Sequence, residues 1–161
     1  MQFAHIAPGS ANDVVAKYNV GGLYLTPEGV ICRYVRNSTD AALAVGDVLC
    51  YAWDGSTGNW LVSNAATSAV DSGLATVNIV AGVALGAVTA SYYTFVQVSG
   101  LNGDTTTDQG VAAGDNLVVD GANTPVGVAD TAVAGEEHAV FGLALAADAS
   151  DSVDCILRMI L

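Results

Sequence analysis

The feature that most constrains this chain is the short spacing of its turn signals. Gly, Asn and Asp recur every few residues, and the runs between them are rich in Val, Tyr, Leu and Trp. Short runs of this kind bounded by turn residues are typical of strands, whereas helix signals are sparse. We therefore expect an all-β fold, a compact β-barrel or β-sandwich-like domain with at most one or two short helices.

Three stretches predict strands next to tight turns. Residues 51–62 read as two strands joined by a glycine-rich turn, with Trp53 and Trp60 flanking it. Residues 92–103 read as a strand that ends at an Asn-Gly turn. Residues 117–129 carry Asp-Gly between two apolar runs, which predicts a third hairpin.

The clearest strand is the C-terminal one, over residues 153–161. One face is wholly apolar, formed by Val153, Cys155, Leu157, Met159 and Leu161. On the other face, Ile156 and Ile160 alternate with Asp154 and Arg158. Because half of this second face is apolar, it is expected to meet a second sheet or a neighbouring subunit, and Ile156 and Ile160 are our candidates for a subunit interface.

The two short helices are expected near the N-terminus and in the middle of the chain. Residues 10–18 begin with Ser10, a residue type that caps helices, and Asp13 follows three residues later. Residues 66–75 suit a single further turn.

A weak internal repeat runs through the chain. Residues 44–49 (AVGDVL) resemble 112–117 (AAGDNL), and 82–85 (GVAL) resemble 142–145 (GLAL), in the same order. Such a repeat indicates two copies of one supersecondary unit. Chance matching of abundant small residues is the alternative.

The domain organisation follows from where regular patterning starts. Residues 1–30 mix apolar side chains with Gly and Pro breaks, which predicts an extended N-terminal arm that docks on its own domain or on a partner. Residues 31–161 form the β domain, with 31–90 and 91–161 as its related halves. The arm residues expected to bind a partner are Phe3, Ile6, Val14, Val15, Tyr18, Leu23, Tyr24 and Leu25.

Charge restricts the classes of partner. The chain has 16 acidic and 4 basic residues, a net charge of −12, and its basic residues do not cluster. Binding to nucleic acid or to an anionic membrane needs several cations on one face, so neither is expected. Residues 72–103 carry no charge, but polar interruptions favour two buried strands over a spanning helix.

Only 12% of the residues are charged, about half the usual share for a soluble domain. Either partners cover part of the surface, or Ala, Ser and Thr cover a compact monomer. The three cysteines are widely spaced, which argues against a disulfide framework or zinc cluster and fits cytosolic synthesis. The first residues predict no signal peptide.

No pattern for catalysis is present. His5 and His138 are far apart, no nucleophile elbow or phosphate loop occurs, and a His138–Cys155 pair is less expected than a buried inert thiol. We expect no enzyme and no cofactor. Asn102, Asp104, Thr106 and Asp108 alternate like calcium ligands, but the loop then departs from the pattern, so a polar hairpin tip is preferred and no metal site is expected.

The second half of the chain resembles the capsid cement, or head decoration, proteins of tailed bacteriophages. The resemblance rests on a GVAL strand, a strand ending in Ser-Gly, an AAGDNL element, a GLAL element and a chain-ending strand, in that order. It covers residues 80–161 and, more loosely, 44–49, and it does not cover the first 30 residues.

This resemblance implies a β-rich homotrimer on the outer capsid surface of the virion, made in the host cytoplasm, that clamps neighbouring major capsid proteins. It carries no catalytic residues. The alternative is a carbohydrate- or surface-binding β module, fibre- or adhesin-like, in which Trp53, Trp60, Tyr92 and Tyr93 form a stacking platform. Solvent exposure of those rings distinguishes the two.

Overall fold

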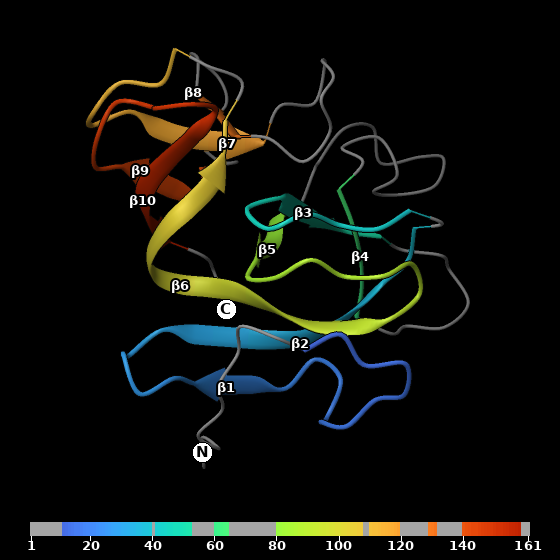
Figure 1. Cartoon of the computed structure of the whole chain (residues 1–161). Coiled ribbons are helices and arrows are strands. Elements are labelled where there is room, and N and C mark those ends of the chain that lie inside the picture. The colour runs from blue at the N-terminus through green and yellow to red at the C-terminus, as the bar shows by residue number, and fades with distance from the viewer. Residues whose placement is uncertain are drawn as a thin grey trace, which may run out of the picture.

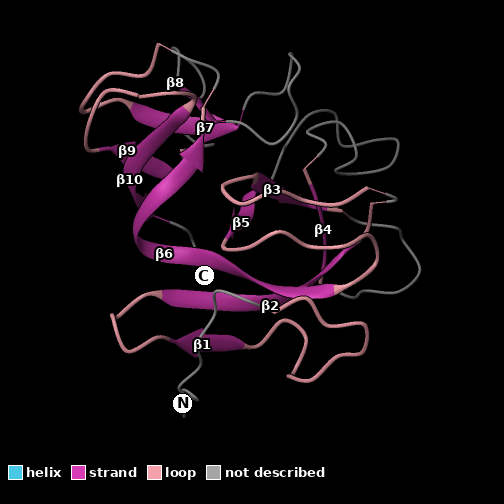
Figure 2. Cartoon of the chain, viewed as in Figure 1, coloured by secondary structure: helices cyan, strands magenta, loops and turns pink. Residues whose placement is uncertain are grey.

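A computed structural model describes residues 11–39, 41–52, 60–64, 80–107, 110–119, 129–131 and 140–158. These residues form strands and turns only, so the expected all-β fold is confirmed (Figure 2). The strands are β1 (Leu23–Leu25), β2 (Ile31–Asn37), β3 (Val48–Tyr51), β4 (Leu61–Ser63), β5 (Val80–Ala84), β6 (Tyr93–Thr106), β7 (Asn116–Val119), β8 (Ala129–Thr131), β9 (Gly142–Ala144) and β10 (Ser152–Arg158).

The short helix expected over residues 10–18 is wrong for its described part. Asp13 instead forms an isolated antiparallel bridge with Tyr93, so the segment is held by tertiary contacts that override the local capping signal. The other expected helix, over 66–75, lies outside the described residues. No helix of the described residues is long and apolar enough to cross a membrane.

The first half of the chain closes into a barrel (Figure 1). Its strand order is β2-β4-β3-β5-β6, and β6 pairs back to β2. All of these pairings are antiparallel except β2 with β4. We call this barrel unit 1.

The second half repeats that order. The C-terminal half of β6 pairs with β10, which pairs with β9, then β7, then β8. A single parallel bridge, Thr107 with Ala129, stands where unit 1 has the parallel pairing of β2 with β4. We call this set unit 2; the long strand β6 belongs to both units and runs from one into the other (Figure 1).

The strand registers show that the internal repeat is structural. In unit 1, Leu49 lies opposite Gly82, and in unit 2 Leu117 lies opposite Gly142. These are the same positions of the two repeated motifs. Chance similarity of small residues would not reproduce the register, because a slip of one residue turns every side chain to the other face.

The turns that lead into β3 and β7 also match. Asp47 accepts a hydrogen bond from the amide of Ala44 at 2.9 Å, and Asp115 accepts one from Ala112 at 2.8 Å. The glycines before them, Gly46 and Gly114, both have positive φ, 83° and 92°. A Gly-Asp pair supplies both needs of this turn, a left-handed backbone and a side-chain acceptor.

Strands pair at two of the three expected hairpins, although the connecting turns, within residues 53–59 and 120–128, lie outside the described residues. β3 pairs with β4 as expected for residues 51–62, although Trp53 lies outside the described residues. β7 pairs with β8.

The expected turn at Asn102-Gly103 is wrong, because β6 continues through it to Thr106. The Asn102 side chain accepts hydrogen bonds from the Asp104 amide at 3.0 Å and the Thr105 hydroxyl at 2.8 Å, and it donates one to Gln97 at 3.0 Å. The local bonds that favour turns at Asn are thus made inside a strand. The strand bends instead at Gly100, where φ is +100°.

The interior of each unit is filled by alternate residues of its strands. Val96 and Val98 of β6 face the core of unit 1, and Cys155 and Leu157 of β10 face that of unit 2. β10 alternates as expected, since Val153, Cys155 and Leu157 are buried while Asp154 and Arg158 are exposed. The last residues of the expected strand, 159–161, lie outside the described residues.

Candidate interaction surfaces

The N-terminal segment, residues 11–25, covers the outer face of unit 1. Its Tyr18 and Tyr24 rings pack edge-on against Phe95, with centroids 5.0 and 5.2 Å away. Tyr18 also meets Tyr34 edge-on at 5.1 Å. Aromatic pairs at such distances add to the stability gained from their buried area. Of the two docking sites left open by the sequence, this part of the chain therefore occupies its own domain.

Asp13 anchors the start of this cover. Its carboxylate accepts a hydrogen bond from the Tyr34 hydroxyl at 2.8 Å and pairs with Lys17 at 2.5 Å. Burial alone would raise the pKa of Asp13, but the bonds from Lys17 and Tyr34 outweigh it and lower that pKa. The ionised form of Asp13 is therefore the one that holds the segment.

The expected partner-binding residues of the arm divide by exposure. Val14 and Val15 stand 67% and 69% exposed, and Tyr18 is 40% exposed. Tyr24 is buried in its own domain, and Leu23 and Leu25 are half-buried in β1. Phe3 and Ile6 lie outside the described residues. Val14 and Val15 are thus the most exposed of the described arm residues expected to bind a partner.

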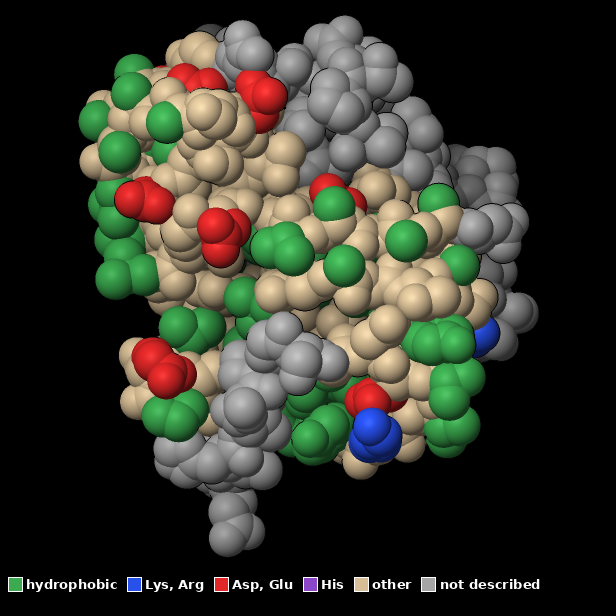
Figure 3. All heavy atoms as spheres, in the orientation of Figure 1, with side chains coloured by type: hydrophobic (Ala, Val, Ile, Leu, Met, Phe, Trp, Pro, Cys, Tyr) green, Lys and Arg blue, Asp and Glu red, His purple; other side chains and the backbone are tan. Residues whose placement is uncertain are grey.

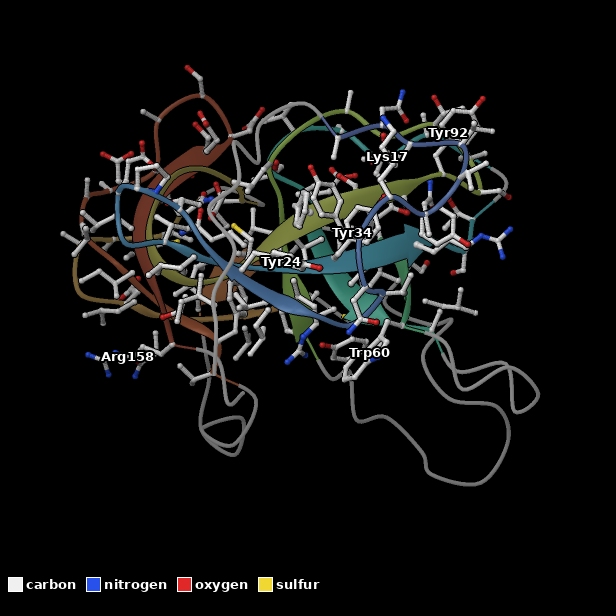
Figure 4. All side chains as sticks on the ribbon, turned by 90° about the horizontal axis from the view of Figure 1, so that it is seen from below. Lys17, Tyr24, Tyr34, Trp60, Tyr92 and Arg158 are labelled. Carbon is white, nitrogen blue, oxygen red and sulfur yellow. The ribbon has the colours of Figure 1, made fainter. Side chains whose placement is uncertain are left out.

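Of the aromatic residues considered for sugar stacking, Trp60 and Tyr92 do not lie side by side; Figure 4 shows them apart, on either side of Tyr34. Trp60 packs directly on Gly21, where an added Cβ would lie 1.8 Å from its indole nitrogen. The Arg33 guanidinium sits 4.6 Å over its ring, yet Trp60 remains 40% exposed. Trp53 lies outside the described residues.

Unit 2 exposes an apolar row across three neighbouring strands. Leu101 of β6 lies opposite Ile156 of β10, which lies opposite Leu143 of β9. Directly opposed residues share a face of the sheet, and this face is the outer one. Leu101 is 65% exposed, and Ile156 and Leu143 are half-exposed. We call these three residues the outer row.

The expected interface residue Ile156 is the centre of the outer row, whereas Ile160 lies outside the described residues. The sequence prediction did not include Leu101, because a turn was expected there. Leu145, 46% exposed and two residues beyond Leu143, was also overlooked. Hydrophobic side chains gather along the left edge of Figure 3, on the side of unit 2.

The same row is buried in unit 1. By strand register, Leu101, Ile156 and Leu143 correspond to Cys32, Gln97 and Val83. Their exposed fractions are 0%, 2% and 0%. Cys32 lies in the aromatic cluster beneath the N-terminal segment, and Val83 packs into the core of unit 2. One position in the fold is thus interior in the first unit and surface in the second.

The thiols are buried and poorly suited to chemistry. Burial raises the pKa of Cys32 and of Cys50 to about 12, and it raises the pKa of Cys155, which contacts the Thr105 hydroxyl at 3.1 Å. A thiol with a raised pKa carries little thiolate, the reactive form. His5 and His138 lie outside the described residues, so the His138–Cys155 pair is not tested.

The polar stretch compared with a calcium loop is not a loop. Asn102, Asp104 and Thr106 lie on the continuous strand β6, and Asn102 is buried and bonded within the chain. The polar hairpin tip preferred from the sequence is therefore also wrong. Asp108 is outside the described residues, and among those described no group of His, Cys, Asp and Glu is placed to hold a metal.

Comparison with known proteins finds a similar solved structure. No protein-family model matches the chain, and no curated protein matches its sequence. Among solved structures, the fold is similar to the N base of the head fiber gp8.5 in bacteriophage phi29, with a TM-score of 0.52 and 17% identity. The match covers 80% of this chain and 94% of that one, and at this identity it establishes a shared fold.

Proposed function

We propose that this chain is a structural protein of a bacteriophage virion, bound to the outside of the head as a homotrimer. The observation that carries the proposal is the fold it shares with the base of a phage head fiber, over 80% of its length. The ordered motifs that resemble head decoration proteins give further support.

The charge of the chain supports an outward location. A net charge of −12 is repelled by packaged nucleic acid, so the protein is suited to the side of the shell that faces away from it. The finer part of the proposal is that the protein clamps neighbouring major capsid proteins. Val14 and Val15, the exposed apolar pair beside Lys17, are our choice of contact with the shell.

A clamp that binds the assembled shell and not its loose parts stabilises the shell by linkage. We expect heads that lack this protein to release their DNA at a lower temperature than complete heads, and added protein to restore the difference. Val14→Asp with Val15→Asp should weaken rescue, because charges would enter an apolar contact. Val45→Asp is the matched control, since Val45 is also exposed, at 49%.

Equal heat resistance of heads with and without the protein would refute the clamp while leaving head binding open. Failure of the purified protein to bind heads at all would refute the virion role. We also propose that the protein has no catalytic activity; a turnover lost on His138→Ala or Cys155→Ala would overturn this.

Trp60 favours a second candidate, a carbohydrate-binding role. Its ring is held by Gly21 and Arg33 and is still 40% exposed, and a fixed exposed indole is suited to stacking on a sugar. Binding to a cell-surface glycan that is lost in Trp60→Ala, with head binding unchanged, would support this role. Glycan binding that is unchanged in this variant would remove it.

A further inference from the structure

The outer row of unit 2 is flanked by two opposite charges on the same strand. Asp154 and Arg158 stand two residues before and after Ile156, on the same outer face of β10. At about 3.4 Å per residue, each charge lies roughly 7 Å along the strand from Ile156. Both are exposed, and Arg158 is the only basic residue after Arg36 in the sequence.

Neither charge has an ion-pair partner among the residues that the structure describes. Among the described residues the one ion pair is Lys17 with Asp13, which belongs to the N-terminal cover of unit 1. Figure 4 shows Arg158 at one end of the molecule and Lys17 towards the other. Asp154 and Arg158 are therefore available for an ion pair with another chain.

The apolar row and the two charges together form a self-complementary surface. A second copy whose β10 faces the first meets apolar residues with apolar residues. If the strands run head to tail around a symmetry axis, Asp154 of one copy approaches Arg158 of the next. The outer row runs across the strands and therefore parallel to the symmetry axis. The rows of all copies then form an apolar centre of the interface, and the charged residues surround that centre.

We propose that the outer row of unit 2, Leu101, Ile156 and Leu143, docks on the same surface of a second copy, with Asp154 to Arg158 ion pairs between copies. The internal repeat explains why we expect the outer row to be buried by a partner, since the equivalent positions of unit 1 are fully buried. We choose a second copy of this chain as the binding partner because the surface carries both members of the proposed ion pair, Asp154 and Arg158. Only the ring size, three copies, rests on the proposed function.

Charge reversal tests the pairing. The full chain is studied by sedimentation velocity and light scattering, with circular dichroism to confirm that each variant is folded. Asp154→Arg and Arg158→Asp should each raise the dissociation constant of the oligomer about tenfold, because like charges then face each other. The double variant should restore association, since the pair is re-formed with its members exchanged. Glu28→Arg, at the exposed turn between β1 and β2, is the control and should leave the oligomer unchanged.

Substitution in the row tests the apolar contact separately. Leu101→Asp should raise the dissociation constant about 100-fold or more, because it places a charge in the centre of the contact. Val45→Asp should leave it unchanged. A monomer for the unmodified chain at its highest soluble concentration, or an oligomer that survives Leu101→Asp and both single reversals, would overturn the proposal.

These outcomes are independent of the virion role. An oligomer with the expected variant pattern that does not bind heads would leave the interface standing and refute the proposed function. Head binding by a protein that is monomeric in solution would support the virion role and refute the proposed interface between copies.

Discussion

Unit 1 and unit 2 use the same strand order, the same registers and the same Gly-Asp turns, yet their outer faces differ. In unit 1 the face over β2 and β6 is closed by residues 11–25, and Phe95 lies buried beneath two tyrosines. In unit 2 the corresponding face carries Asp154 and the outer row, and it is open. Whether a given position is buried or exposed is therefore not determined by the repeated unit. It is determined by which other segments pack over that position.

The reason for the difference is the path of β6. Unit 1 is preceded by a segment long enough to fold back over it. Unit 2 begins within β6, which is still paired in unit 1, so among the described residues no segment before unit 2 folds back over it. In the oligomer proposed above, another copy of the chain covers this face.

The largest expected loss of stability comes from removing the ring of Phe95, which the N-terminal segment buries. Phe95→Ala should lower the free energy of unfolding by about 3–5 kcal/mol, since it empties a buried aromatic site. Asp154→Ala, at the corresponding position of unit 2, should change it by less than about 0.5 kcal/mol. Urea unfolding followed by tryptophan fluorescence measures both, and similar losses would show that the two faces are alike.

The same reasoning revises what truncation should do. From the sequence alone, a chain that begins near Val30 should stay folded and bind its assembly more weakly. Because Tyr24 is 9% exposed and packs on Phe95, removing residues 1–29 should also cost several kcal/mol of stability. A truncated chain as stable as the full one would show that the cover adds nothing to the fold.

The next largest difference in stability is expected between substitutions at the equivalent glycines Gly82 and Gly142. A Cβ at Gly82 would lie 2.6 Å from the carbonyl oxygen of Gln97, and its φ is +152°. A Cβ at Gly142 would lie 3.3 Å from the carbonyl oxygen of Ile156, which a small shift relieves. Gly82→Ala should cost about 3 kcal/mol or more, from strain and overpacking, and Gly142→Ala about 1 kcal/mol. Thermal unfolding of the two variants checks the order, which equal losses would contradict.

Substitution of the two turn aspartates, Asp47 and Asp115, should give a smaller difference in stability than substitution of the two glycines. Asp47 is buried and accepts bonds from Ala44 and the Asn64 side chain, so Asp47→Ala leaves donors unsatisfied and should cost about 1–3 kcal/mol. Asp115→Ala, at the half-buried turn of unit 2, should cost about 1 kcal/mol or less. Chemical denaturation of both variants at neutral pH tests this, and a larger loss for Asp115→Ala would refute it.

The smallest effects concern pH and have opposite signs. Asp13 has a lowered pKa, so its contribution to stability is present above the ordinary value of 3.8 and is lost as pH falls through the lower, folded-state pKa. Burial raises the pKa of Asp47 despite its hydrogen bonds, so its ionised form is unfavourable at neutral pH. That cost disappears as pH falls through the raised pKa.

The two carboxylates can be separated by amide substitution. The stability difference between the unmodified chain and Asp13→Asn should shrink on acidification below pH 3.8. The unmodified chain should instead gain relative to Asp47→Asn over the interval from the raised pKa of Asp47 down to 3.8. Unfolding curves across this range measure both, and differences of the same sign would contradict the assignment.

Fold class, the repeat and the alternation of β10 could be read from the sequence because each depends on periodicity or on local turn chemistry. The continuation of β6 through Asn102 could not, since the Asn102 side chain makes its hydrogen bonds to Gln97 and Thr105 along the same strand and not across a turn. Burial of Tyr24 and exposure of Leu101 were equally inaccessible. Both depend on which segment covers which face, and hydrophobic residues alone do not specify this.

The strand shared by the two units has a mechanical consequence. A force that pulls on unit 2 passes along the β6 backbone into the pairing with β2, so the two units resist load together rather than one after the other. Under tension we therefore expect the two units to unfold in a single event.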